Sequence, residues 1–237
     1  MIEDRGIVVL VVDATKAAVL TNQLSQLKRD FIGDGWCVRR IDVSPDLPAV
    51  AVREAIRTIY QQAPTEVKAA FLLGNIATPY SGSITPDGHY GDHTGAWPAD
   101  VYYGEMTDQW RDSAINTTQA TRPENHNVPW DGKFDTSRVS SDVEIAIGRV
   151  DFSNLPAFSD SEEALLANYL DKNHRYRHRK FTLDQQGFIQ DGLNWLTTAP
   201  GSGAHRAASA CFGQNRLTTC SWDSALQDTA NSYAIAW

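Results

Sequence analysis

The chain has 237 residues, of which 42% are hydrophobic, and its 21 basic and 29 acidic side chains give a net charge of −8. A chain of this length buries roughly 70% of its unfolded surface, which is enough for a core without disulfides. The acidic balance argues against a nucleic-acid partner, because phosphate binding depends on clustered Lys and Arg. No apolar run reaches the roughly 18 residues of a membrane span. Composition therefore indicates a globular enzyme or binding module.

The first 74 residues alternate between strand and helix patterns. The apolar run Gly6–Val12 is too short for a signal peptide and is typical of a strand buried on both faces. Leucines and Phe31 then recur at helical spacing until Gly33. The expected elements are a strand at 6–12, a helix at 20–31, a strand at 36–42, a helix from Pro48 and a strand at 68–73. This βαβαβ unit predicts an α/β fold with an open, mostly parallel, doubly wound sheet.

The remainder of the chain divides at about residue 141. Residues 75–141 are rich in Gly, Pro, Asp and Asn and predict a long irregular loop region, which in a compact domain is usually functional. Residues 142–237 are expected to continue the sheet, so that 1–237 forms one α/β domain, itself incomplete. The expected elements are a strand at 142–148, a helix opened by a capping box at Ser159–Glu162, and strands at 181–189 and 231–237.

Three segments, read in chain order, resemble the gingipain family of cysteine peptidases, whose catalytic domain is related to caspases. They are the strand and its exit at 70–79, an Asp-x-x-Tyr-Gly element at 99–104, and a strand ending in Gly-Arg at 142–150. The similarity spans roughly residues 6–190. It implies a caspase-like fold, a protein or peptide substrate, and an extracellular or cell-surface location in a bacterium.

The catalytic residues of that family are not expected within this sequence. The family pattern places a His-Gly pair at one strand end and an Ala-Cys pair further along, where the Cys thiolate attacks the scissile carbonyl. Here the strand that would deliver the His is Tyr233–Trp237, where the sequence ends. The resemblance therefore implies the N-terminal portion of an exported gingipain-like cysteine endopeptidase. Its catalytic His and Cys would lie beyond residue 237, in the rest of the domain or of a longer polypeptide.

The cysteines offer one misleading motif. Ser209–Gly213 mimics the Ala-Cys-x-Gly around a caspase-type nucleophile, and His205 lies six residues before Cys211. However, six residues cannot hold a strand and a helix, and the Ala-rich stretch before Cys211 predicts a helix. Cys211 is thus expected to be a partly buried structural cysteine. Its pairing with Cys220, which export would permit, stays open.

Potential metal ligands are densest in a glycine-rich loop. The candidates are Asp87, His89, Asp92 and His93, with a second pair at Asp131 and Asp135. The His and Asp together could bind zinc, and the carboxylates alone could bind calcium. Turns whose His and Asp side chains bond the backbone explain the same residues without a metal. The family resemblance favours structural calcium.

One further residue and two other functions stay open. Asp191 follows the strand expected at 181–189 and lies near where arginine-specific gingipains place a specificity Asp, although a turn-forming Asp-Gly pair explains it equally well. The chain could instead be a noncatalytic, calcium-stabilised binding or scaffolding module of caspase-like fold. The weaker alternative is a metal-dependent hydrolase centred on residues 87–93.

Overall fold

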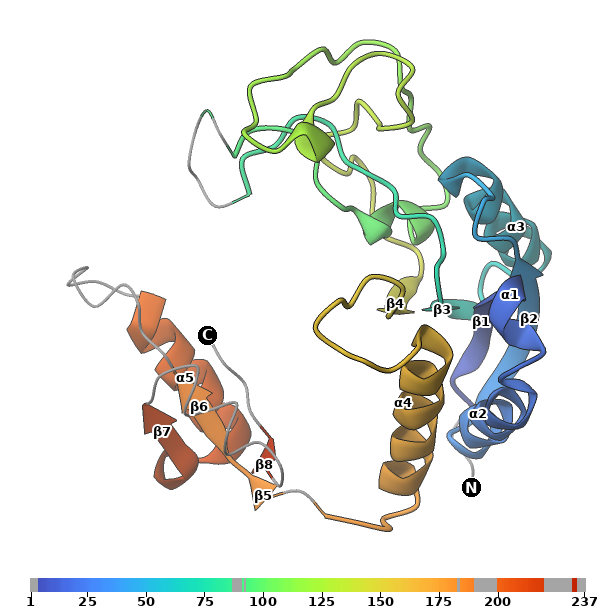
Figure 1. Cartoon of the computed structure of the whole chain (residues 1–237), viewed down its shortest axis with the longest axis vertical. Coiled ribbons are helices and arrows are strands. Elements are labelled where there is room, and N and C mark those ends of the chain that lie inside the picture. Colours follow the sequence, from blue (N-terminus) through green and yellow to red (C-terminus); the bar gives the residue numbers. More distant parts are fainter. Residues whose placement is uncertain are drawn as a thin grey trace. The chain divides into compact units, whose positions relative to one another are not determined.

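The computed structural model describes residues 4–86, 91, 93–182, 184–189, 200–219 and 232–233. The chain divides into two compact units, Met1–His174 and Arg175–Trp237, which can be followed by colour along the sequence in Figure 1. Within the described residues, no helix combines the length and the apolar character that crossing a bilayer requires.

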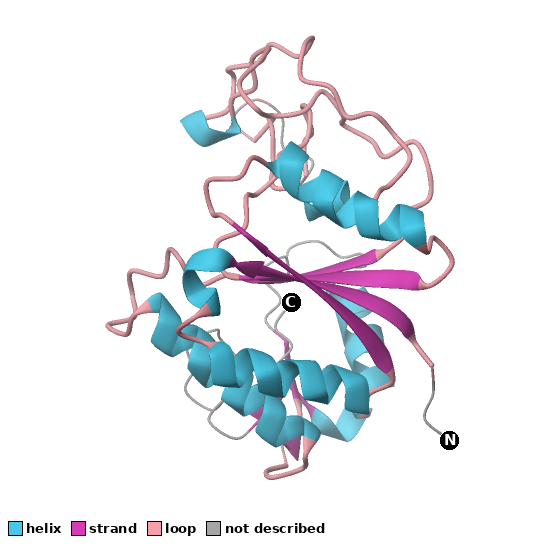
Figure 2. Cartoon of the chain, turned by 90° about the vertical axis from the view of Figure 1, so that its right-hand side faces the viewer, coloured by secondary structure: helices cyan, strands magenta, loops and turns pink. Residues whose placement is uncertain are grey.

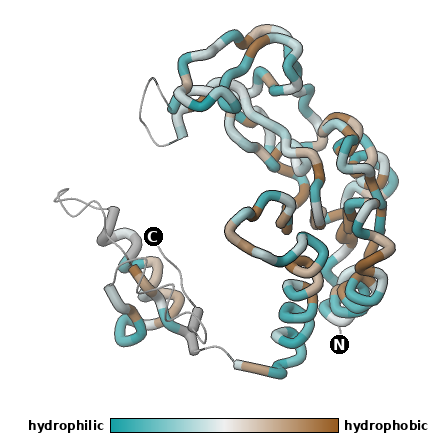
Figure 3. Tube along the Cα trace, in the orientation of Figure 1, coloured by the Kyte–Doolittle hydropathy of each residue, from teal (hydrophilic) through white to brown (hydrophobic). Residues whose placement is uncertain are grey.

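The first unit is built on a four-stranded sheet whose neighbouring strands all pair in parallel. In spatial order the strands are β2 (Trp36–Val43), β1 (Gly6–Asp13), β3 (Val67–Leu73) and β4 (Ala146–Val150). β1 is an interior strand, and every residue from Val8 to Asp13 is buried because both faces of the sheet are covered. The trace in Figure 3 shows how hydrophobic residues gather along the strands of this unit.

Helices cover both faces of this sheet, as Figure 2 shows. The α-helices of the first unit are α1 (Ala14–Ala17), α2 (Thr21–Gly33), α3 (Ala49–Gln62) and α4 (Glu162–Arg177), of which α4 extends three residues past the boundary of the unit. Val9 and Val11 of β1 share a core with α3, whereas Val8 and Leu10 share a second core with α2 and α4. Alternate residues of one strand therefore face opposite helix layers. This arrangement confirms the predicted α/β fold with an open, mostly parallel, doubly wound sheet.

The long irregular region predicted at 75–141 is present between β3 and β4, and residues 75–145 are called the β3–β4 segment below. Its only helical turns within the described residues are η1 (Asp100–Tyr103) and η2 (Pro123–Asn125). Tyr102 stacks on Phe134 with ring centroids 4.3 Å apart, and both rings belong to the core on the α3 face of the sheet. The segment therefore packs as part of the unit, although little of it is regular.

Two predicted boundaries differ from the structure. The strand expected at 142–148 begins only at Ala146, because the backbone N–H groups of Glu144 and Ile145 donate to the carbonyl of Gly104 (3.1 Å each) instead of to a strand. The capping residue of α4 is Ser161 rather than Ser159, since the Ser161 hydroxyl accepts from the N–H of Ala164 at 3.3 Å.

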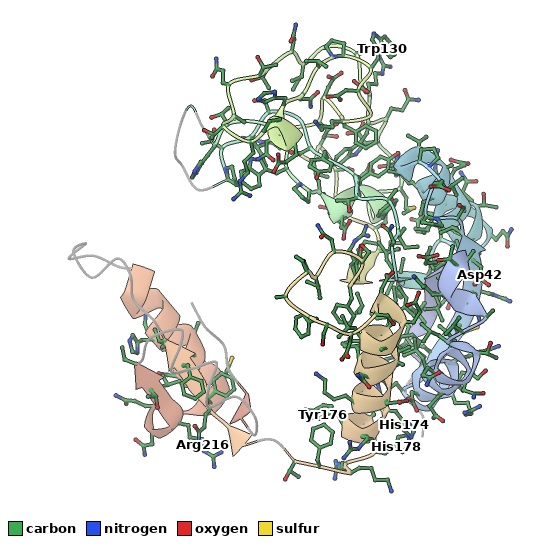
Figure 4. The ribbon with its side chains drawn as sticks, in the orientation of Figure 1. Asp42, Trp130, His174, Tyr176, His178 and Arg216 are labelled. Carbon is green, nitrogen blue, oxygen red and sulfur yellow. The ribbon has the colours of Figure 1, made fainter. Side chains whose placement is uncertain are left out.

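Within its described residues the second unit contains short strands, one α-helix and one 3-10 helix, and Figure 4 draws its side chains and labels Arg216. Its described elements are β5 (Asp184–Gln185), β6 (Gly187–Ile189), α5 (Pro200–Phe212), η3 (Gln214–Arg216), β7 (Leu217–Thr219) and β8 (Ser232–Tyr233). β5 pairs in parallel with β8, and β6 pairs in parallel with β7. The predicted continuation of the first sheet is thus seen for β4, whereas the described strands of the second unit pair with one another. The helix expected before Cys211 is present as α5.

Candidate functional site

The first candidate site is the carboxyl edge of the four-stranded sheet. Val12 of β1 pairs with Leu73 of β3, which pairs with Val150 of β4, so the three strands end side by side. In open parallel sheets, ligands bind in the crevice outside these carboxyl ends. The β3–β4 segment leaves the sheet at this edge and re-enters it at the opposite edge, where Ala146 of β4 pairs with Ala69 of β3. The first residues of the segment therefore border any ligand bound at the carboxyl edge.

Asp13 fixes the turn between β3 and the segment. Its buried carboxylate accepts from the N–H and hydroxyl of Thr15 at 2.8 and 2.7 Å, and from the N–H of Asn75 at 3.3 Å. Gly74 adopts φ +89°, and a Cβ at that position would lie 2.6 Å from the Cβ of Asp13. Asp13 is therefore occupied in holding two chain segments together and is not presented to a substrate.

Arg149 is the most highly connected charge at this edge. Its guanidinium forms a two-pronged ion pair with Asp100 of η1, at 2.8 and 2.9 Å, and donates to the carbonyls of Ile76 and Ala77. Burial alone would lower the pKa of Arg149, but the hydrogen bonds and charge of Asp100 outweigh it and raise that pKa. The hydroxyl of Tyr103 also donates to Ala77, at 2.6 Å. Arg149 thus ties the start of the β3–β4 segment to η1.

A second charged group joins two helices of the first unit. Lys16 of α1 contacts the carboxylates of Glu162 and Glu163 at the start of α4, at 2.8 and 2.6 Å. The hydrogen bond from Lys16 is the main reason that the pKa of Glu163 falls to about 2. Because the single ammonium of Lys16 bridges both carboxylates of α4, this group is a structural clamp between the two helices.

A pocket of about 380 Å³ opens between two parts of the β3–β4 segment. One wall is formed by residues 81, 84 and 98–101, and the other by residues 136–139. The wall residues include the aliphatic side chains of Ile84, Val101 and Val139 and the charged side chains of Asp100 and Arg138. Since Asp100 is paired with Arg149, the pocket adjoins the carboxyl edge described above.

The two walls of the pocket are joined by the backbone. The N–H of Gly82 donates to the carbonyl of Thr136 at 2.7 Å, and a Cβ on Gly82 would lie 2.5 Å from the carbonyl oxygen of Asp135. The fully buried side chain of Asn127 donates to the carbonyls of Ser81 and Phe134, at 3.3 and 2.9 Å. The two walls of the pocket are therefore held together by hydrogen bonds of the chain itself.

The predicted metal residues fall into three groups. Asp87, His89 and Asp92 lie outside the described residues. His93 is described, and its carbonyl accepts from the indole N–H of Trp97 at 3.0 Å. Asp131 accepts from the N–H groups of Val128 and Lys133. The calcium site at 87–93 therefore stays a prediction.

The carboxylate of Asp135 is occupied by hydrogen bonds from the chain itself, which leaves no lone pair for a cation. It accepts from the backbone N–H groups of Ser113, Ala114 and Ile115, at 2.8 to 3.1 Å, and from the hydroxyl of Ser113. These bonds outweigh the effect of burial and lower the pKa of Asp135. A carboxylate has roughly four lone-pair positions, and these are filled by the chain itself.

Cys211 was predicted to be a partly buried structural cysteine and not a nucleophile. Cys211 is exposed on α5, so the prediction that it is partly buried was wrong, and its thiol is free. His205 lies on the same helix, six residues earlier, which separates the two side chains by about 9 Å along the axis and by roughly 240° around it. They therefore cannot meet as a dyad. Asp191, the predicted substrate-binding residue, lies outside the described residues.

Two connections were missed by sequence reasoning. Arg53 of α3 pairs with Glu105, and Arg149 pairs with Asp100, and neither pair was predicted from the sequence. A signal existed for Arg149, because a charged residue in an otherwise apolar parallel strand needs a partner. Nothing in the sequence indicates which of the many acidic residues in the β3–β4 segment supplies it.

Comparisons with known proteins bear on the fold. No protein-family model and no curated protein matches the chain. Among solved structures it is similar to the Arg-specific cysteine proteinase gingipain R (RGPB), with a TM-score of 0.51 and 15% sequence identity. The fold is gingipain-like. The match covers 92% of this chain and 41% of the gingipain R chain, so these residues span less than half the length of that protein.

Proposed function

We propose that this chain is the N-terminal portion of an exported gingipain-like cysteine endopeptidase. The observation that carries the proposal is the match to gingipain R over 92% of this chain, with a parallel sheet in the strand order β2-β1-β3-β4. The three sequence segments that resemble the family support the same assignment. The substrate would be a protein or peptide, and the working location would be extracellular or at the cell surface.

In this proposal the catalytic His and Cys come from polypeptide beyond residue 237. His205 and Cys211 are excluded from that role because α5 holds them on different sides of one helix. The part described here would act as scaffold, with Arg149 and Asp100 bracing the carboxyl edge of the sheet near which substrate binds. Asp191 is the proposed specificity residue, where an acidic side chain would attract a basic substrate residue.

The proposal is tested by comparing two proteins, the 237-residue chain and a version extended along the encoded polypeptide past Trp237. Both are assayed with a mixture of fluorogenic peptides that carry Arg, Lys or an apolar residue before the scissile bond. Hydrolysis is expected only in the extended version, and a thiol-alkylating reagent should abolish it. Activity of the 237-residue chain that survives Cys211→Ala would contradict the assignment.

A noncatalytic binding module is the second candidate, because His205 and Cys211, the His and Cys that lie near each other in the sequence, are held apart on α5. An extended version that lacks a His-Gly and a later Ala-Cys, and that cleaves none of the peptides, would favour this candidate. Metal analysis tests the third function, a metal-dependent hydrolase. This function requires that the protein retain zinc or another transition metal after dialysis against a chelator.

A further inference from the structure

The pocket between residues 81–101 and 136–139 carries hydrogen-bond donors that the protein does not use. Thr136, Ser137 and Arg138 follow one another along one wall. Within the part of the chain that the structure describes, the hydroxyls of Thr136 and Ser137 and the guanidinium of Arg138 have no hydrogen-bond or ion-pair partner. Three successive donors beside one cavity are therefore available to a ligand.

The charge balance of the pocket is positive. Its one acidic side chain, Asp100, is held by two hydrogen bonds from Arg149 and is neutralised by that guanidinium. Arg138 is exposed and carries an uncompensated charge. A guanidinium together with hydroxyl donors is suited to an anion with planar oxygens, because Arg presents a fork of N–H groups that matches a carboxylate.

The rest of the lining is apolar and restricts the size of the ligand. Ile84, Val101 and Val139 contribute aliphatic surface, as do Pro98 and Ala99. A volume of about 380 Å³ lies at the small end of the range for ligand sites. It has room for one aliphatic side chain with its carboxylate.

We propose that this pocket binds the C-terminal residue of a peptide, with an aliphatic side chain between Ile84 and Val139 and the terminal carboxylate on Arg138 and Ser137. The joined walls leave the pocket little to reorganise on binding, since Gly82 is bonded to Thr136 and Asn127 to both Ser81 and Phe134. The inference does not rest on peptidase activity, because it concerns binding by residues of the first unit alone.

The test is an NMR titration of the 237-residue chain with N-acetyl-leucine and, as a matched ligand, N-acetyl-leucinamide. The free acid should bind at least about tenfold more tightly, because charge-assisted hydrogen bonds are roughly twice as strong as neutral ones. Its affinity should also fall as salt is raised. Equal affinity for acid and amide, or no shifts up to the solubility limit of the ligand, would overturn the proposal.

Substitutions identify the donors. Arg138→Gln should reduce the affinity for the acid to that for the amide, and Arg138→Lys should restore part of it. Arg122→Gln, at an exposed arginine outside the pocket lining, is the matched control and should change nothing. Ile84→Ser should weaken both ligands. Unchanged binding in Arg138→Gln, or octanoate binding more tightly than N-acetyl-leucine, would contradict a peptide C-terminus as the occupant.

Discussion

Arg53 of α3 and Glu105 of the β3–β4 segment form a buried ion pair, with Nη2 and Oε2 2.9 Å apart. The Glu105 side chain is 0% exposed and also accepts from the N–H groups of Thr107 and Asp108, each at 2.7 Å. Burial raises the pKa of Glu105, but these hydrogen bonds and the charge of Arg53 outweigh it and lower that pKa. Glu105 therefore anchors the segment to α3 and is not available to a metal.

Replacing this carboxylate should be severely destabilising. We expect Glu105→Gln to lower the free energy of unfolding by about 3–5 kcal/mol, because it leaves the buried guanidinium of Arg53 without a counter-charge. Urea denaturation followed by circular dichroism measures the change. The double variant Arg53→Met, Glu105→Gln should recover more than half of the loss, since it removes both charges and keeps a side-chain oxygen that accepts from the N–H groups of Thr107 and Asp108. A loss below about 1 kcal/mol in Glu105→Gln would show that the pair does not anchor the segment.

Arg149→Met should also destabilise the first unit, by about 2 kcal/mol, because the substitution removes charge-assisted bonds to Asp100 and leaves the carbonyl of Ile76 without its donor. The free energy of unfolding in urea is again the measurement. Arg138→Gln is the matched control, since Arg138 is exposed and unpaired within the described residues, and its effect should stay within about 0.5 kcal/mol. Equal effects of the two variants would contradict the structural role of Arg149.

The pH dependence of stability should report on the contact between Lys16 and Glu163. The pKa of Glu163 falls from 4.5 to about 2 on folding, mainly through its hydrogen bond with Lys16. A lowered pKa in the folded state stabilises the protein above pH 4.5, and this contribution is lost as the pH falls from 4.5 to 2. Glu163→Gln should therefore reduce the proton uptake on unfolding in that interval by up to about one proton. An unchanged slope of stability against pH would contradict this assignment.

Gly82→Ala should separate the two walls of the pocket. The added Cβ would lie 2.5 Å from the carbonyl oxygen of Asp135 and from Oγ of Ser137, and a backbone oxygen cannot move aside cheaply. We expect a loss of about 1–3 kcal/mol in unfolding free energy. Gly33→Ala is the control, because its Cβ would meet no atom within 4 Å, and it should be neutral or slightly stabilising. An unchanged free energy of unfolding in Gly82→Ala would show that the two walls of the pocket can separate without cost.

The elements of the first 74 residues could be predicted because local pattern and tertiary burial agree there. The continuous β-branched run in β1 predicts a strand covered on both faces, and β1 is such a strand. The apolar stripe of α2 predicts a helix with one buried face, and that face packs in the core against the sheet. The strand at Ala146–Val150 was misplaced by four residues, because Glu144 and Ile145 alternate like a strand while their N–H groups bond to Gly104. That partner lies about forty residues away in the sequence and leaves no local signal.

By itself the sequence determined the layer architecture and the irregular character of residues 75–141, since both follow from hydrophobic spacing and turn residues. Only the tertiary structure decided what the charged residues of that region do. Glu105 and Asp100 became partners of Arg53 and Arg149, while Asp135 became an acceptor for three backbone N–H groups. The physical reason is that a carboxylate looks the same in sequence whether it meets a cation, an N–H group or water, and long-range packing alone selects among them.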